Sequence, residues 1–403
     1  MENLSRRRVL TLGAALGLTS VALEAPSVWS WSSAGSIAHA DTVTDPFQVW
    51  DPAAEQVAAQ LLADGSIPAV NAAWNSWRLN RDPLPAGMPA YLTSYLQQVN
   101  KLPTWADPAK LAKAQALYKR LSGYLFISES LGSGFLSTVI PREARSVYWS
   151  AGGANMQDRA AKTFTFGYDL HNEKAFDPTG SFITTANKTR LVHAMVRKLL
   201  PLSPHFQATA DQPLPISNGD ILVTFHSVAT VAYNNLEKWG VRTTASEEVA
   251  DLHAWQVALS LLGVQDQFIP QTWADAKAQA QQMLWPRVAP TAEGNDLAQK
   301  LLDAVKGLGT DLSTGFVSEM VRYLIGDTYW SWLGLPTDLI SRALIKVNWP
   351  IYVAFREGST LIVPSSFNLF DGFVRGISMM YLNNGASATQ TPITLPSANR
   401  PGA

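Results

Sequence analysis

The sequence predicts an all-α protein, and three observations lead to this fold class. Apolar residues recur at steps of three and four along most of the chain, as in Ser181 to Leu200, SFITTANKTRLVHAMVRKLL, which is typical of helices with one buried face. Asp-Pro pairs and a Ser-Glu-Glu motif precede several of these runs, and such residues cap helix N-termini. Only Gly358 to Val363, with its TLIV, is a candidate strand.

The first 40 residues form an export signal rather than part of the fold. Ser5-Arg6-Arg7-Arg8 precedes an apolar run from Val9 to Leu23, and Ala38-His39-Ala40 fits a small-residue cleavage site. The apolar run is too short for a membrane anchor. We therefore expect a secreted protein, exported by the twin-arginine route and cleaved after Ala40, which leaves 403 − 40 = 363 residues. This route carries folded proteins, so it suits a protein that acquires a cofactor before export.

The mature chain is expected to fold as one domain over residues 41–385, because no solenoid-like repeat interrupts it. Residues 386–403 lack any period and are expected to be disordered. The helices expected between these limits are Pro46 to Ala63, Pro68 to Leu79, Pro89 to Val99, Asp107 to Ser122 and on toward Glu129, Pro141 to Trp149, Asn155 to Gly167, Ser181 to Leu200, Asp220 to Trp239, Ser246 to Leu262, Thr272 to Trp285, Gly294 to Leu308, Thr314 to Ile325 and Pro336 to Val347.

Composition excludes several classes of partner and site. Lys and Arg number 31 against 32 Asp and Glu, so no basic surface for nucleic acid or an anionic membrane is expected. The absence of cysteine excludes disulfides, thiolate ligation of iron and sulfur-based zinc sites. Nor does the chain contain G-x-S-x-G, H-E-x-x-H, Walker A or G-x-G-x-x-G motifs. Nothing in the sequence signals an oligomer, and a monomer is the default expectation.

His193 is the first candidate for chemistry. It lies on the edge of the apolar face formed by Val192, Met195 and Val196, where a neutral imidazole can serve as an axial ligand of haem iron. Arg197, one turn further on, can pair with a haem propionate. The alternative is a core histidine that binds only a backbone carbonyl, which is the commoner case for half-buried histidines.

Three other groups of polar residues stand among aromatic residues. Arg159, Lys162 and Thr163 fall on one helical face, which is either a pocket wall or simply solvated. Glu143, flanked by two arginines, is either a base with a raised proton affinity or half of a surface ion pair.

Thr224 and His226 form the third group, inside the apolar segment ILVTFHSVATVAY. They are either a locally satisfied buried pair or part of a cofactor site, in which His226 would compete with His193 as the ligand.

With these residues assembled, the chain resembles the latex clearing protein family of actinobacterial rubber oxygenases. The resemblance covers essentially the whole chain and rests on four segments: MENLSRRRVLTLG at the N-terminus, RAAKTFTFGYDL at 159–170, KTRLVHAMVRKLLP around His193, and GDTYWSWLGLP at 326–336.

The resemblance implies one non-covalent haem b in a globin-like helical core with additional N- and C-terminal helices. It implies an enzyme that uses dioxygen to cleave poly(cis-1,4-isoprene) internally, leaving aldehyde and ketone ends. By position, His193 matches the proximal iron ligand and Lys162 the distal ligand of a closed state. Glu143 matches the catalytic base, and Arg159 and Thr163 match polar residues on the haem side. Thr224 and His226 are assigned to the cofactor site in the same way, but in a less certain register.

Two other functions remain open from the residues alone. A globin-like oxygen carrier would bind dioxygen reversibly without consuming it in the presence of polyisoprene. A secreted lipid-binding protein would carry no cofactor and would be colourless. An absorption spectrum distinguishes the second from the other readings, and oxygen uptake with latex distinguishes the first.

Overall fold

The structure of the protein is a computed structural model that describes residues 31–40, 43–151, 156–306, 313–388 and 392–400. Side chains are described for all of these except residues 156–161, 164, 305–306 and 378–388. The leader predicted at 1–40 therefore lies largely outside the described residues.

The described residues are helical, with two isolated β-bridges and no strand among them, which confirms the predicted all-α class. The α-helices are α2 (Pro52–Asp64), α3 (Ile67–Trp74), α4 (Ala90–Val99), α5 (Pro108–Phe126), α6 (Gly134–Leu136), α7 (Pro141–Trp149), α8 (Met156–His171), α9 (Phe182–Leu199), α10 (Pro204–Thr209), α11 (Asn218–Phe225), α12 (Val231–Trp239), α13 (Ala245–Leu261), α14 (Trp273–Met283), α15 (Ala292–Lys306), α16 (Thr314–Ile325), α17 (Asp327–Ser331), α18 (Leu339–Arg356) and α19 (Phe367–Ala388). No helix among the described residues combines the length and apolar character needed to cross a membrane.

Aspartate followed by proline caps two helix starts, one of them as predicted. Asp107 precedes Pro108 and accepts bonds from the first free backbone amides of α5. The helix expected from Pro46 begins only at Pro52, where Asp51 caps α2, and Pro46–Gln48 forms a separate 3-10 turn. The capping box of α13 is formed by Thr244 and Glu247, two residues before the predicted start at Ser246.

Two helices pass through wider π-helical turns, at Ile127–Ser133 after α5 and at His226–Thr230 between α11 and α12. Gly132 and Gly134, which follow the helix expected to run toward Glu129, lie within continuous helical structure. π-turns frequently occur at functional sites because they push a side chain out of the regular spacing. Here they contain Glu129 and His226, two buried ionisable side chains.

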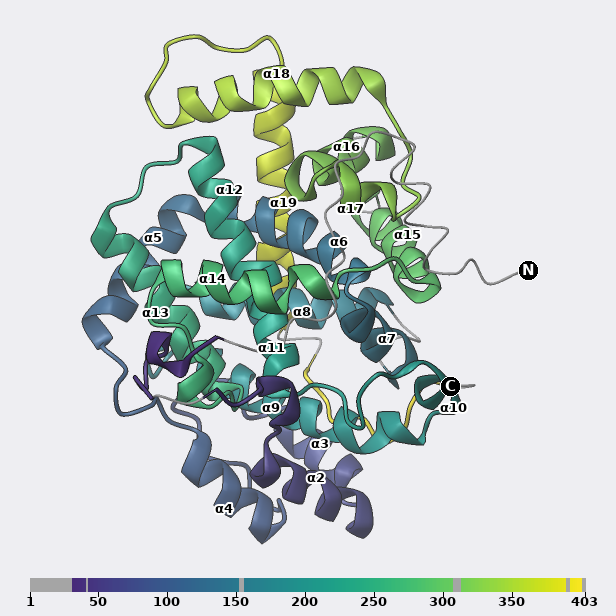
Figure 1. Ribbon diagram of the computed structural model, residues 1–403. Helices are drawn as coiled ribbons and strands as arrows, with labels where there is room; N and C mark the ends of the chain where they lie inside the picture. Colours follow the sequence, from purple (N-terminus) through teal and green to yellow (C-terminus); the bar gives the residue numbers. More distant parts are fainter. Residues whose placement is uncertain (1–30, 41–42, 152–155, 307–312, 389–391, 401–403) are drawn as a thin grey trace.

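The helix α9 joins the hydrophobic clusters of the molecule. Its first turns belong to the large cluster built on α5, α11, α13 and α16, and its middle belongs to a smaller cluster with α2, α3 and α4. Figure 1 shows α18 at one end of the molecule and α2 and α4 at the other, with α8, α9 and α11 between them.

Three expectations about the second half of the chain were wrong, and one helix was missed. The segment 360–364 is extended but pairs with no strand among the described residues, and α18 runs on through Pro350 to Arg356. The missed helix is α19, which packs along α8. The tail expected to be disordered is packed over residues 392–400: Leu395 is buried in the smaller cluster and exchanges two hydrogen bonds with Asn71.

Residues 31–40 also pack against the body. Trp31 and Ser36 are buried, and the amide of Ile37 donates to the carbonyl of Ile269. The predicted cleavage after Ala40 would remove this packed segment.

Candidate active site

The predicted site residues lie on four helices, α7, α8, α9 and α11, which are all found below α18 in Figure 1. Each helix contributes one predicted residue: Glu143 from α7, Lys162 from α8, His193 from α9 and Thr224 from α11. The structure brings α7 against α11 and α8 against α9.

Glu143 and Thr224 are in direct contact. Pro141 starts α7, so Glu143 lies in its first turn, and its Oε1 accepts a hydrogen bond of 2.6 Å from the Thr224 hydroxyl. The two arginines beside Glu143 have other carboxylates as partners: Arg142 bonds to Asp211 and Asp220, and Arg145 pairs with Glu293. The surface ion pair proposed as the alternative role for Glu143 is therefore not formed with either neighbour.

Thr224 is accessible to solvent. Its side chain is exposed, whereas residues 217–223 and 225–227 are buried. Because the Thr224 hydroxyl bonds to the half-buried Glu143, the carboxylate lies beside a position that solvent reaches.

Lys162 and His193 lie on neighbouring helices and are both half-buried. The Lys162 ammonium lies 3.5 Å from the hydroxyl of Thr394 in the packed C-terminal segment. His193 lies on the edge of the apolar face of α9, as predicted, between half-buried Val192 and buried Ala194. Thr163 is exposed, and the side chain of Arg159 lies outside the described residues.

Arg197 has protein partners. Its guanidinium is buried, lies 3.1 Å from Glu55 and donates to the carbonyl of Ile216. Burial lowers the pKa of Arg197, although the nearby carboxylates oppose this shift. These contacts tie α9 to α2, and the pairing with a haem propionate stays a prediction.

Of the two alternatives given for His226, its contacts match the buried residue whose hydrogen bonds are satisfied within the core. It is fully buried, and its ring nitrogens lie 3.0 Å from the Thr230 hydroxyl and 3.0 Å from the Gln279 amide oxygen. Burial lowers its pKa to about 3, so the ring is neutral at physiological pH. With both nitrogens engaged, His226 is a poor competitor for the role of iron ligand.

A second polar centre, not predicted from the sequence, lies between α5, α8 and α13. We call it the sealed cluster; it comprises Tyr118, Glu129, His171 and Asp251, all buried. The Tyr118 hydroxyl donates to Asp251 at 2.9 Å, and the His171 ring stands edge-on to Tyr118 at 4.4 Å. The one available signal was Glu129 itself, a carboxylate inside the apolar run YLFISESL.

The sealed cluster is kept neutral by burial. Desolvation raises the pKa of Glu129 well above its usual value, raises that of Asp251 to about 7, and lowers that of His171 to about 3. Glu129 Oε1 and His171 Nε2 are 3.4 Å apart, but these shifts make the pair an uncharged contact rather than an ion pair.

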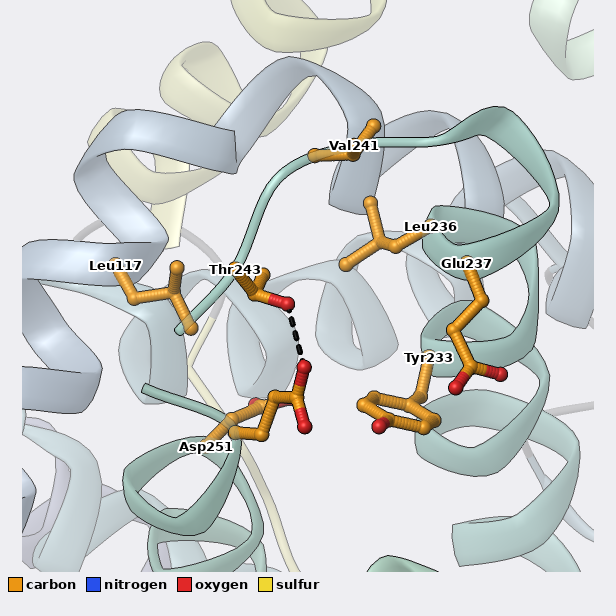
Figure 2. A pocket seen from close by; sticks show the side chains of 8 residues that line it. Leu117, Tyr233, Leu236, Glu237, Val241, Thr243 and Asp251 are labelled. Atoms are coloured by element: carbon orange, nitrogen blue, oxygen red, sulfur yellow. Dashed lines mark hydrogen bonds between the residues drawn. The ribbon is translucent and has the colours of Figure 1, made fainter. Parts of the chain in front are cut away.

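A small cavity adjoins the sealed cluster. Figure 2 shows it lined by Leu117, Tyr233 and Leu236, with Glu237, Val241, Thr243 and Asp251 around them. Its volume is about 20 Å³, roughly that of one water molecule. It is therefore too small for a cofactor or a polymer segment, so it cannot be the site of polymer cleavage.

Comparisons with known proteins agree on one family. Residues 118–353 match the family model described as "ER-bound oxygenase mpaB/B'/Rubber oxygenase, catalytic domain". Over 410 residues the chain is 40% identical to "Rubber oxygenase" of Streptomyces sp. (strain K30), and the alignment covers 100% of both chains. The fold is similar to a solved structure described as "Structure of Latex Clearing Protein LCP in the closed state", with a TM-score of 0.84 and 41% identity over 87% of this chain and 96% of that one. The matched family region contains all four of the residues that the structure places at the candidate site.

Proposed function

The chain belongs to the rubber oxygenase family and is an oxygenase; from this premise we propose that it is a secreted, haem-dependent dioxygenase that cleaves poly(cis-1,4-isoprene) internally. The products are oligo-isoprenoids with an aldehyde at one end and a ketone at the other. The observation that carries this proposal is the contact of Glu143 with the solvent-accessible Thr224, in a chain 40% identical to a rubber oxygenase over its whole length.

The donor set of the candidate site suits haem b. His193 offers an imidazole from α9, Lys162 offers an amine from the adjoining α8, and the chain has no cysteine that could bind iron instead. We assign His193 as the proximal ligand and Lys162 as the distal ligand of the closed state, with Arg159 and Thr163 on the distal side. When bound, haem would supply the iron that binds and activates dioxygen.

Glu143 acts as the base. Its half-buried carboxylate can accept an allylic proton from the polymer, and the hydrogen bond from Thr224 to Oε1 fixes the direction in which Oε2 points. Thr224 is thus a positioning residue, whose effect on the reaction passes through Glu143.

Export follows the twin-arginine route. Its basis remains the order of charge, apolar run and small-residue site in residues 1–40. Folding and cofactor insertion would then precede secretion.

Replacing His193 with alanine tests the proposal. The purified variant should lack the haem absorption of the wild type and should consume no dioxygen with polyisoprene latex. A matched control is His205→Ala, because His205 lies on α10, outside the site, and stacks on Trp149; it should retain both properties. Circular dichroism of the two variants should show the same helix content.

A His193→Ala protein that kept its haem and its oxygen uptake would refute the assignment. A wild type that held haem and bound oxygen, yet consumed none with latex, would refute the catalytic proposal and favour an oxygen carrier.

A further inference from the structure

The exposed apolar side chains of the molecule are concentrated in one place. Among the described residues, nine large apolar side chains are exposed, and six of them lie between residues 339 and 363. These six are Leu339 (70% exposed), Ile340 (83%), Val347 (62%), Leu361 (96%), Ile362 (66%) and Val363 (57%). Single exposed apolar residues are ordinary, but a group of them marks an interaction surface.

The helix α18 is apolar on both of its faces. Its inner face buries Ile345, Trp349, Tyr352 and Val353. At 3.6 residues per turn, Leu339, Ile340, Ala343, Val347 and Pro350 fall within an arc of about 100° on the opposite side, and all five are exposed. A surface helix normally turns charged residues outward, so this outer face is unusual.

The charged side chains of α18 are directed away from that strip. Arg342 forms a two-pronged ion pair with Glu319 on α16, and Arg356 pairs with Asp371 on α19. Lys346 is exposed but lies on the flank of the strip. The strip itself therefore presents no charge.

The connection between α18 and α19 extends the apolar surface. Figure 1 shows this connection arching out beyond α18 at one end of the molecule. Its base is held, because Arg242 donates to Ser359 and Pro364 is buried, while Leu361, Ile362 and Val363 between them are exposed. The fold thus supports three apolar side chains at its periphery.

We propose that this surface, formed by Leu339, Ile340, Val347, Leu361, Ile362 and Val363, adsorbs the enzyme to solid or emulsified hydrocarbon polymer; the inference rests on the proposed function. A polyisoprene particle is uncharged and has no hydrogen-bonding groups, so its complement is an exposed apolar surface without charge. It differs from the cleavage site, since α18 lies at one end of the molecule, whereas α7 and α11, the helices of Glu143 and Thr224, lie well below it in Figure 1.

The extent of the surface distinguishes this partner from a second copy of the chain. A specific protein interface uses about 20–30 residues on each side and includes polar groups at its rim. The surface here has six large apolar residues. Adsorption to a hydrocarbon needs only apolar area and no shape-matched partner.

The test uses the holoenzyme and a triple variant, Ile340→Asp, Val347→Asp and Ile362→Asp. The control is Leu202→Asp with Val249→Asp, two exposed apolar residues outside this surface. Each protein is mixed with polyisoprene particles without oxygen, and the bound fraction is measured after centrifugation. Oxygen uptake is then measured with particles and with a short isoprenoid in detergent.

We expect the triple variant to need at least fivefold more particle surface for half-maximal binding, and its uptake on particles to fall in parallel. Its uptake with the short isoprenoid should stay within twofold of the wild type, and the control should match the wild type throughout. A wild type that bound particles but consumed no oxygen with either substrate would refute the proposed function and leave the adsorption measurement intact.

Unchanged particle binding by the triple variant would overturn the inference. So would an equal loss with the short isoprenoid, which would place the effect at the cleavage site. Equal binding of the wild type to phosphatidylcholine vesicles would indicate a membrane surface instead. A dimeric wild type with a monomeric triple variant and unaltered adsorption would indicate an interface between copies.

Discussion

The candidate active site and the sealed cluster both combine a carboxylate with a hydroxyl, but they differ in access. In the candidate site Thr224 donates to Glu143 at 2.6 Å and its side chain is exposed. In the sealed cluster Tyr118 donates to Asp251 at 2.9 Å and both side chains are buried. Strong pKa shifts with a charge partner often indicate catalytic groups. Here large shifts occur in a centre that only a water-sized cavity adjoins, so access is the better guide to the reaction.

Glu143→Gln gives the largest expected effect and tests the accessible side of this comparison. Loss of a general base typically costs about 10²–10⁴ in rate, so the turnover rate measured by oxygen uptake should fall at least about 100-fold. Haem content and unfolding temperature should be those of the wild type. The control is Glu173→Gln, an exposed carboxylate at the end of α8 paired with Lys119; full activity in Glu143→Gln would exclude the base.

The pH dependence of the free energy of unfolding tests the sealed cluster. The pKa of His171 is 6.5 in the unfolded chain, and burial lowers it to about 3 in the folded protein. Between these values the unfolded state binds more protons, so the contribution of His171 is complete above pH 6.5 and is lost as the pH falls. Asp251, whose pKa is raised to about 7, works in the opposite direction.

His171→Phe should remove the loss of stability at low pH that comes from the histidine, while keeping the aromatic contacts. Between pH 6.5 and pH 4, the free energy of unfolding of the variant should fall by roughly 3 kcal/mol less than that of the wild type. Urea titrations at the two pH values measure this difference. If the free energy of unfolding depended on pH identically in the two proteins, folding would not lower the pKa of His171.

Tyr118→Phe and its control compare the loss of a hydroxyl donor to a buried carboxylate with the loss of one to an exposed carboxylate. It removes the hydroxyl that donates to buried Asp251, and leaving a buried acceptor unsatisfied should lower the free energy of unfolding by about 1–3 kcal/mol. The control is Tyr91→Phe, since Tyr91 donates to the exposed Asp64 at 2.6 Å. It should cost less, because water replaces the lost donor. Activity per folded molecule should be unchanged in both variants.

Thr224→Val gives the smallest expected effect. The variant keeps the shape of the side chain but loses the donor to Glu143, and one hydrogen bond contributes about 0.5–1.5 kcal/mol. The turnover rate should therefore fall about twofold to tenfold. Thr224→Ser should restore most of the rate, whereas a Thr224→Ser protein as slow as Thr224→Val would argue against a positioning role.

The sequence predicted most helices because their signals are local. Asp51 and Asp107 cap helices within three residues of themselves, and α7 begins and ends where its proline and the change in pattern indicated. The packed segment 392–400 was missed because its order comes from distant partners, Asn71 and Leu199 among them. The π-turns were missed because an added residue per turn leaves little trace in a periodic pattern.

The individual residues of the candidate site could be predicted from the sequence, but the contacts between them could not. His193 was placed correctly on the edge of an apolar face, and Glu143 and Thr224 were both selected, but nothing in their spacing of 81 residues indicated that they touch. Arg197 was selected for a cofactor contact, and its protein partner Glu55, which lies 142 residues earlier in the chain, could not be seen from the helix. Long-range partners thus decide which polar residues are available for chemistry.

The contact between Asn71 and Leu395 spans 324 residues. The early helices α2 to α4 therefore acquire one of their core partners only after the ribosome has translated residue 395, so that end of the molecule must be completed after synthesis rather than during it. A translocase that threads a nascent, unfolded chain would separate these partners across the membrane. One that accepts finished, folded cargo would keep them together.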